Sequence, residues 1–198
     1  MTVCQAAESR RSIRKYVQED IPEEDFWEIL RQVSLAPSPD NVQPWRFVVV
    51  RDPRVLPKLA EAALNQRQVH SAHAVFVLYA DMEDVVGTID QVIHPGFSAD
   101  AVAKLKARLL KQFAAQVPEE RQRYAHGIAY IALGYLLLAA EAMGYRTSPM
   151  LGFEPEKVKA LLGLPSHVTI PALIAIGKGD EPGSPHYRHS VDRIARFV

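Results

Sequence analysis

Three arginines and a serine lie close together near the start of the chain, at Arg10, Arg11, Ser12 and Arg14. A guanidinium group presents forked N–H donors that match phosphate oxygens, and a serine hydroxyl adds a further donor. The cluster therefore fits a phosphate cradle. A solvated basic patch is the competing interpretation, and the residues of the cluster alone do not separate the two.

A second group of polar side chains lies at residues 41–45, Asn-Val-Gln-Pro-Trp, between a proline-rich stretch and an apolar one. Asn and Gln amides each offer donors and an acceptor, which is the pattern that the edge of a flavin ring or a ribityl chain needs. Ordinary turn chemistry beside a packed tryptophan would give the same residues, so this alternative stays open.

Two later segments carry weaker signals. Residues 148–153, Ser-Pro-Met-Leu-Gly-Phe, are predicted as a turn, where glycine would let the backbone approach a flat ligand. His186-Tyr187-Arg188 offers another basic contact for a phosphate. The paired histidines, His70 with His73 and His186 with His189, lack a third ligand at a recognisable spacing, so no metal site is expected.

Composition limits the classes of partner. Lys plus Arg and Asp plus Glu both number 23, so the chain has no net charge to attract nucleic acid or an anionic membrane. The single cysteine, Cys4, cannot form an internal disulfide, and the first residues lack a secretory pattern. A cytoplasmic protein is therefore expected. The longest apolar run, residues 128–140, is shorter than the roughly 20 residues of a membrane span and indicates a buried helix.

The elements that must position these residues follow from the apolar periodicity. Helices are predicted around residues 4–10, 26–33, 56–64, 102–113, 118–143 and 155–162, and strands around 47–50, 74–79 and 168–176. Pro171 inside the last strand indicates an edge or a bulge. Residues 83–97 are ambiguous, and the chain after 179 is expected to be extended. Because helices and strands do not alternate regularly, one α+β domain over residues 1–198 is predicted.

The order and spacing of the segments carry more information than any one of them. Arg-Arg-Ser-Ile-Arg at 10–14 is followed by Ala-Pro-Ser-Pro-Asp-Asn-Val-Gln-Pro-Trp-Arg-Phe-Val-Val-Val at 36–50, by Pro-Met-Leu-Gly-Phe at 149–153 and by a late basic residue. This arrangement closely resembles the nitroreductase family over about residues 8–195, and most of all its NADH oxidase branch. The resemblance implies a central mixed, mainly antiparallel sheet flanked by helices, in an intertwined homodimer. The tail, about residues 180–198, would wrap the partner subunit.

The resemblance also implies FMN at the subunit interface. Arg10, Arg11 and Ser12 would hold its phosphate and ribityl region, and His186 and Arg188 would complete the phosphate site. Arg14 would lie at the pyrimidine edge, where a fixed cation stabilises the negative charge of the reduced ring. The remaining ring contacts would come from Pro37, Ser38, Asn41 and Gln43 of the other subunit, and from Gln66, Pro149, Met150, Leu151 and Gly152.

The catalytic assignment that follows is Arg14 with a backbone N–H of Leu151 or Gly152 near flavin N5. NADH or NADPH would deliver hydride to N5 and leave before an acceptor enters, in a ping-pong sequence. Family acceptors include nitroaromatics, quinones, flavins and oxygen. Two residues depart from the expected pattern: Leu151 replaces a carboxylate of other branches, and Asp40 replaces an aromatic residue. A specialised flavin-fragmenting or dehalogenating enzyme, or a non-enzymatic flavin-binding protein, is the alternative.

Overall fold

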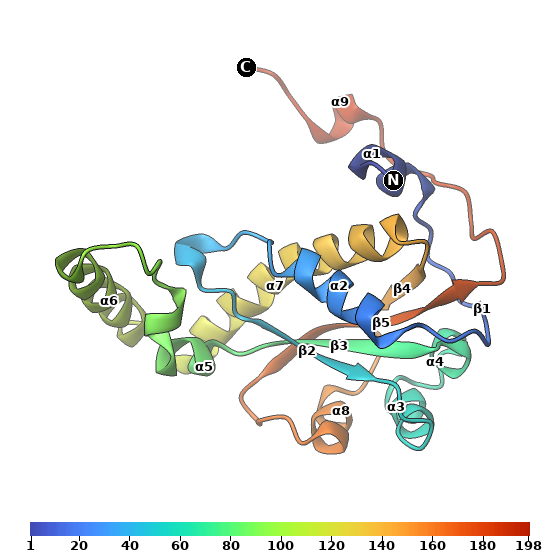
Figure 1. The fold of residues 1–198 in the computed structure, drawn as a ribbon, viewed down its shortest axis with the longest axis horizontal. Helices are drawn as coiled ribbons and strands as arrows, with labels where there is room; N and C mark the ends of the chain where they lie inside the picture. Colours follow the sequence, from blue (N-terminus) through green and yellow to red (C-terminus); the bar gives the residue numbers. More distant parts are fainter.

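A computed structural model describes all 198 residues. Its centre is a five-stranded sheet in the order β1-β5-β3-β2, with β4 also paired to β5 (Figure 1). The strands are β1 (Tyr16–Val17), β2 (Trp45–Val50), β3 (Ala74–Ala80), β4 (Arg146–Met150) and β5 (Thr169–Gly179). Every strand pair is antiparallel, and one isolated parallel bridge joins Ser12 to Thr147. The predicted α+β class and mainly antiparallel sheet are therefore confirmed.

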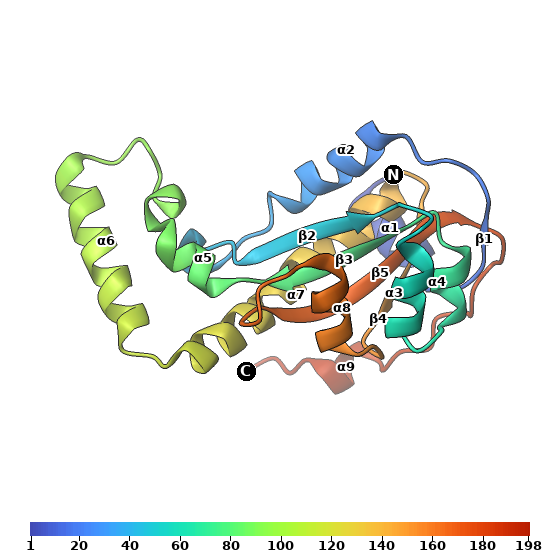
Figure 2. The same ribbon diagram turned by 90° about the horizontal axis from the view of Figure 1, so that it is seen from below.

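Helices cover both faces of this sheet (Figure 2). The first face carries α1 (Val3–Ser9), α2 (Glu23–Val33) and the long α7 (Pro118–Ala142); the second carries α3 (Leu56–Ala62), α4 (Arg67–Ser71) and α8 (Pro155–Leu162). Side chains alternate between the faces along β3. Phe76 and Leu78 pack toward α7, whereas Val75 and Val77 pack toward α3 and α8. The continuous apolar run of β3 is thus explained by burial on both sides.

A separate group of helices projects from one end of the sheet. It comprises α5 (Met82–Gly87), the 3-10 turn η2 (Ile89–Val92) and α6 (Ala99–Ala114), and the short turn η1 (Pro39–Asn41) lies beside it (Figures 1 and 2). The segment that was ambiguous in sequence, 83–97, contains α5 and η2. Asp81 caps α5 through a bond from the Asp84 N–H, and Ser98 caps α6 through the Ala101 N–H.

The long helix α7 is a core helix on one side only. By length and composition it is a candidate membrane span, but it packs on α2 and on the sheet, where Ala129, Ala132 and Leu136 are fully buried. The prediction of a buried helix is confirmed for that side. The opposite side leaves large side chains exposed in the single chain: Tyr124, Tyr130, Ile131 and Tyr135.

One prediction of local structure was wrong, and another is confirmed. Ser148–Met150, predicted as part of a turn, lie in β4, where Pro149 is opposite Ile174 of β5; the chain leaves the sheet only at Leu151. Pro171 was predicted to mark an edge or a bulge, and the pairing of β5 with β4 ends at Leu173, so Pro171 has no strand neighbour on that side. The bulge alternative holds: the register shifts from Leu78 opposite Ala172 to Ala80 opposite Thr169. A bulge leaves one residue outside the ladder of hydrogen bonds, so the strand does not need the backbone N–H that proline lacks.

The last segment differs slightly from the expected extended tail. It contains one helical turn, α9 (Val191–Ile194), and is otherwise without regular structure after β5 ends at Gly179. The residues after 188 are exposed in the single chain.

Candidate active site

The tail runs back along the N-terminal basic segment, and this pairing builds the site. β1 pairs with the end of β5 through Tyr16 opposite Gly179. Beyond the strand, the Arg14 N–H donates to Oε1 of Glu181 at 2.7 Å. Gly183 then has a φ of 73°, and a Cβ placed there would lie 2.7 Å from the Cβ of Arg11. Only glycine satisfies both conditions, so the tail can press against the segment 10–14 and continue to His186.

Four of the predicted phosphate ligands meet at this point. The Nε2 atom of His186 lies 2.8 Å from Nη1 of Arg11 and 2.8 Å from the carbonyl oxygen of Arg10. The guanidinium of Arg188 is close enough to lower the pKa of Arg10 through charge repulsion. The structure therefore brings these residues together, although they come from opposite ends of the sequence.

The Arg10 guanidinium is the member of this group that lacks an acceptor. It donates no hydrogen bond to protein, and its Nη1 atom is buried without a partner. Burial lowers the pKa of Arg10, Glu141 opposes that shift, and the charges of Arg188 and Arg11 add to it. Buried donors are almost always satisfied, and forked donors with no acceptor suit an anion with several oxygens. The residues present therefore fit a bound phosphate group.

Ser12 connects this basic group to the segment predicted to face the ring. It forms the isolated bridge with Thr147, and the next N–H, that of Ile13, donates to the Thr147 carbonyl at 3.1 Å. From Thr147, β4 carries Pro149 and Met150 to the exposed Leu151 and Gly152. The phosphate group and the proposed ring-facing backbone thus lie on adjoining parts of one sheet edge.

Gln66 lies against this same backbone. Its Nε2 donates to the Gly152 carbonyl oxygen at 2.5 Å, and its Oε1 accepts from Nε2 of Gln68 at 2.9 Å. The chain reaches Gln66 through Leu64 and Asn65, which both have positive φ and reverse its direction after α3. The structure thus brings Gln66 to Gly152, another of the residues predicted to contact the ring.

Arg14 has a neighbour that the sequence reasoning missed. The Arg14 side chain is exposed and has no ion pair or hydrogen bond of its own. Glu181, which accepts the Arg14 N–H, also lies 3.8 Å from Nη2 of Arg67. Arg67 directly follows Gln66, and this position next to a predicted site residue was the one sequence signal that could have indicated it. Two cations and one carboxylate therefore lie together beside the Gln66–Gly152 contact.

The remaining predicted residues lie elsewhere in the chain. Gln43 N–H donates to Ser38 Oγ at 3.0 Å, and Asn41 Nδ2 donates to the Val92 carbonyl at 2.9 Å. Asp40, with a φ of 49°, pairs with Arg108 of α6 at 2.6 Å. These bonds hold the loop that follows Pro37 beside η2 and α6, at the other end of the sheet from β1 and α1 (Figures 1 and 2). One chain therefore carries two separate halves of the predicted site.

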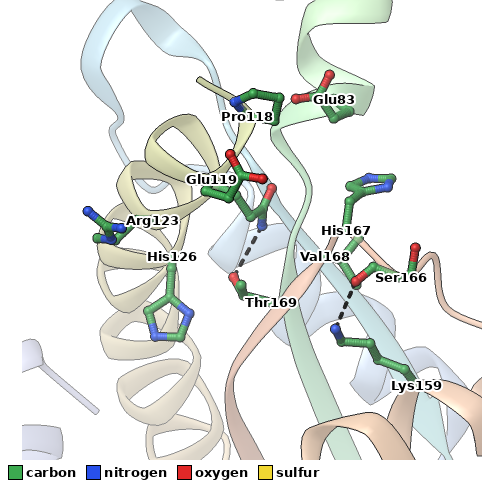
Figure 3. A pocket seen from close by; sticks show the side chains of 11 residues that line it. Glu83, Pro118, Glu119, Arg123, His126, Lys159, Ser166, His167, Val168 and Thr169 are labelled. Carbon is green, nitrogen blue, oxygen red and sulfur yellow. Dashed lines mark hydrogen bonds between the residues drawn. The ribbon is translucent and has the colours of Figure 1, made fainter. Parts of the chain in front are cut away.

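One well-formed cleft holds none of the predicted residues. It has a volume of about 580 Å³ and lies between the first turns of α7 and the segment that enters β5 (Figure 3). Only one of its 11 lining residues is hydrophobic, and His167 within it pairs with Asp81 at 2.9 Å. Flat ring ligands are usually held in mainly apolar pockets, so this cleft is a poor match for the flavin ring. The basic group on the tail is the better candidate.

Comparison with known proteins agrees with the geometry. The model of the Nitroreductase family matches residues 7–178. The chain belongs to the nitroreductase family. A protein of Thermus thermophilus named NADH dehydrogenase is 49% identical over 189 residues, covering 96% of this chain and 92% of the relative. The putative NAD(P)H nitroreductase YdgI of Bacillus subtilis is 34% identical over 95% of this chain and 93% of its own length.

Solved structures of nitroreductase-family proteins share the fold. A putative nitroreductase of Exiguobacterium sibiricum, solved in complex with FMN, is 28% identical with a TM-score of 0.87. The match covers 100% of this chain and 98% of the other. The predicted nitroreductase-like fold is thereby confirmed. His186 and Arg188 lie beyond the residues that the family model matches, so their place beside Arg10 and Arg11 rests on the structure itself.

Proposed function

We propose that this chain is an FMN-dependent NAD(P)H oxidoreductase that works as a homodimer. The observation that carries the proposal is the Nη1 atom of Arg10, which is buried without an acceptor and lies within a basic group open to an anion. The names of the relatives support the choice of NADH or NADPH as donor, and the FMN in the Exiguobacterium sibiricum structure supports the choice of flavin.

Different residues would bind different parts of this cofactor. Arg10, Arg11, Ser12, His186 and Arg188 would bind the phosphate and ribityl region. Bound FMN would supply the chemistry, which is acceptance of a hydride from a reduced nicotinamide and its release to a second substrate. Arg14 would hold a positive charge near the ring edge and so favour its reduced form. Gln66 fixes the Gly152 backbone, and the exposed Leu151 and Gly152 leave the approach to the ring open.

The proposed order of events is ping-pong, because donor and acceptor would use the same open face in turn. No acid–base pair is required of the protein, since protons can come from solvent. Nitroaromatics, quinones, flavins and oxygen are the proposed acceptors.

The homodimer is proposed from two features of the single chain. First, the loop carrying Ser38 and Asn41 lies far along the sheet from Arg10, so the predicted site is complete only if a second copy supplies that loop. Second, Tyr124, Ile131 and Tyr135 form an exposed apolar stripe on α7, and such stripes mark association surfaces. The exposed tail after residue 188 would wrap the partner.

Anaerobic reduction of the purified protein tests this function. We expect a yellow protein whose flavin absorbance is bleached by NADH or NADPH and restored by quinones, nitroaromatics, free flavin or oxygen. A protein that is colourless and binds no added FMN would refute the proposal. A yellow protein that neither NADH nor NADPH bleaches would instead identify a non-enzymatic flavin-binding protein.

A further inference from the structure

A buried carboxylate lies behind the basic group. Glu141 is in the last turn of α7 and its side chain is 0% exposed. A negative charge is disfavoured at this end of a helix, where the backbone carbonyls already carry a partial negative charge. It is also costly to bury unless cations and hydrogen bonds compensate for lost solvation. Glu141 therefore depends on the groups that surround it.

Two of these groups fix one of its oxygens. Oε1 accepts a hydrogen bond from Ser9 Oγ at 2.8 Å and forms an ion pair with Arg146 Nη1. Ser9 is the last residue of α1, and Arg146 is the first residue of β4. The carboxylate thus links the end of α1, directly before Arg10, to the start of β4, which contacts Ser12 through Thr147.

The other oxygen, Oε2, is buried and has no hydrogen-bond partner. The Nη1 atom of Arg10 is buried and unpartnered as well, and the charge of Glu141 raises the pKa of Arg10 against the effects of burial. Because Ser9, which bonds Glu141, directly precedes Arg10, the carboxylate lies behind Arg10 without forming an ion pair with it. The like charges of Arg11 and Arg188 lie on the other side, with His186.

We propose that Glu141 is a positioning residue for the phosphate: it holds Arg10, against repulsion by its neighbouring arginines, in the place from which Arg10 binds the phosphate of FMN. This inference rests on the proposed function. Without the charge of Glu141, the buried Nη1 atom of Arg10 has no protein anion near it, and the like charges of Arg11 and Arg188 favour movement of the Arg10 side chain toward solvent. The affinity that is lost is then the part contributed by the phosphate, and the part contributed by the flavin ring is unchanged.

Riboflavin provides the discriminating probe, because it has the same ring and ribityl chain but no phosphate. Apo-protein is titrated with FMN and with riboflavin, and the ratio of the two dissociation constants isolates the contribution of the phosphate. We expect Glu141→Gln to lower the preference for FMN by about tenfold or more, the scale of a charge-assisted hydrogen bond, with riboflavin affinity unchanged. An unchanged preference, a tighter FMN complex or an equal loss for both ligands would overturn the proposal.

Glu8→Gln is the matched control. Glu8 is exposed on α1, close to the same basic group, and its side chain has no partner, so this variant makes the same change in net charge without touching Arg10. We expect its FMN preference to equal that of the wild type. An equal effect in both variants would mean that Glu141 acts only through the long-range field, which also overturns the positioning role.

A second variant covers the case in which Glu141→Gln does not fold. Ser9→Ala keeps the carboxylate and removes the hydroxyl that fixes it, so we expect a smaller fall in the same ratio. An unchanged ratio in folded Ser9→Ala would then decide against the inference. Failure of the proposed function is distinguishable, because in that case the wild-type protein itself would not prefer FMN to riboflavin.

Discussion

The amide of Gln66 and the carbonyl of Gly152 are 2.5 Å apart although 86 residues separate them in the chain. This contact fixes the backbone that follows β4, where Leu151 and Gly152 become exposed. Since a net hydrogen bond contributes about 1 kcal/mol, Gln66→Ala is expected to slow flavin reduction by about fivefold. Anaerobic stopped-flow measurement of flavin bleaching checks this. Gln18→Ala removes a comparable amide contact, to the Ser71 carbonyl, and is expected to leave the rate unchanged.

Arg14 is expected to act on the rate of reduction more than on cofactor binding. Its side chain makes no contact that supports the fold, and its charge is proposed to favour the reduced ring. Arg14→Ala should therefore lower the rate of flavin reduction by about 10²-fold while most FMN is retained. Stopped-flow rates and flavin content per chain measure the two effects. An equal loss of both would contradict the role, and Arg54→Ala, at an exposed arginine near Asp52, serves as the control.

The exposed stripe on α7 is expected to hold the dimer and, through it, the cofactor. Ile131→Glu places a charge in this stripe, where Ile131 is 40% exposed in the single chain. A buried charge without a partner is costly, so the variant should be monomeric and should lose FMN together with the dimer. Light scattering and flavin content measure these outcomes. Phe97→Glu, in the loop before α6, should stay dimeric; a monomeric Ile131→Glu that keeps full FMN would argue against a shared site.

His73 is expected to make stability depend on pH. Its Nε2 accepts the Ile21 N–H at 3.3 Å, and its ring stacks on Phe26. Burial and the charge of Arg51 lower its pKa in the folded state, with Asp20 opposing. The unfolded chain therefore binds the proton more readily, and the free energy of unfolding falls as pH drops below about 6.5. Urea denaturation of His73→Gln should show a weaker fall than that of His189→Gln, which alters an exposed tail histidine.

Helices and strands could be predicted where their own residues show a clear apolar run or periodicity. The apolar run of β3 and the periodic apolar positions of α2 both form as expected, and Gly163 ends α8 in the left-handed region with a φ of 64°. By contrast, β1 has two residues and β4 contains Pro149. Both are strands because β5, far along the sequence, pairs with them, and no local signal reports such a partner.

The same distinction applies to the site. The basic cluster at 10–14 was recognisable because its members are adjacent, and the family resemblance placed His186 and Arg188 with it. Arg67 and Glu141 were missed, because each is an ordinary helical residue whose role depends on side chains brought near by folding. Pro171 alone was enough to predict an edge or a bulge, and β5 has a bulge at that point.

The contact of His186 with Arg11 spans 175 residues, so the proposed phosphate site can form only after almost the whole chain has been made. A chain still emerging from the ribosome carries the arginines of its first turns long before the histidine that faces them exists. If these residues hold the flavin phosphate as proposed, its capture would follow synthesis of nearly the entire polypeptide, and newly made protein would pass through an apo stage.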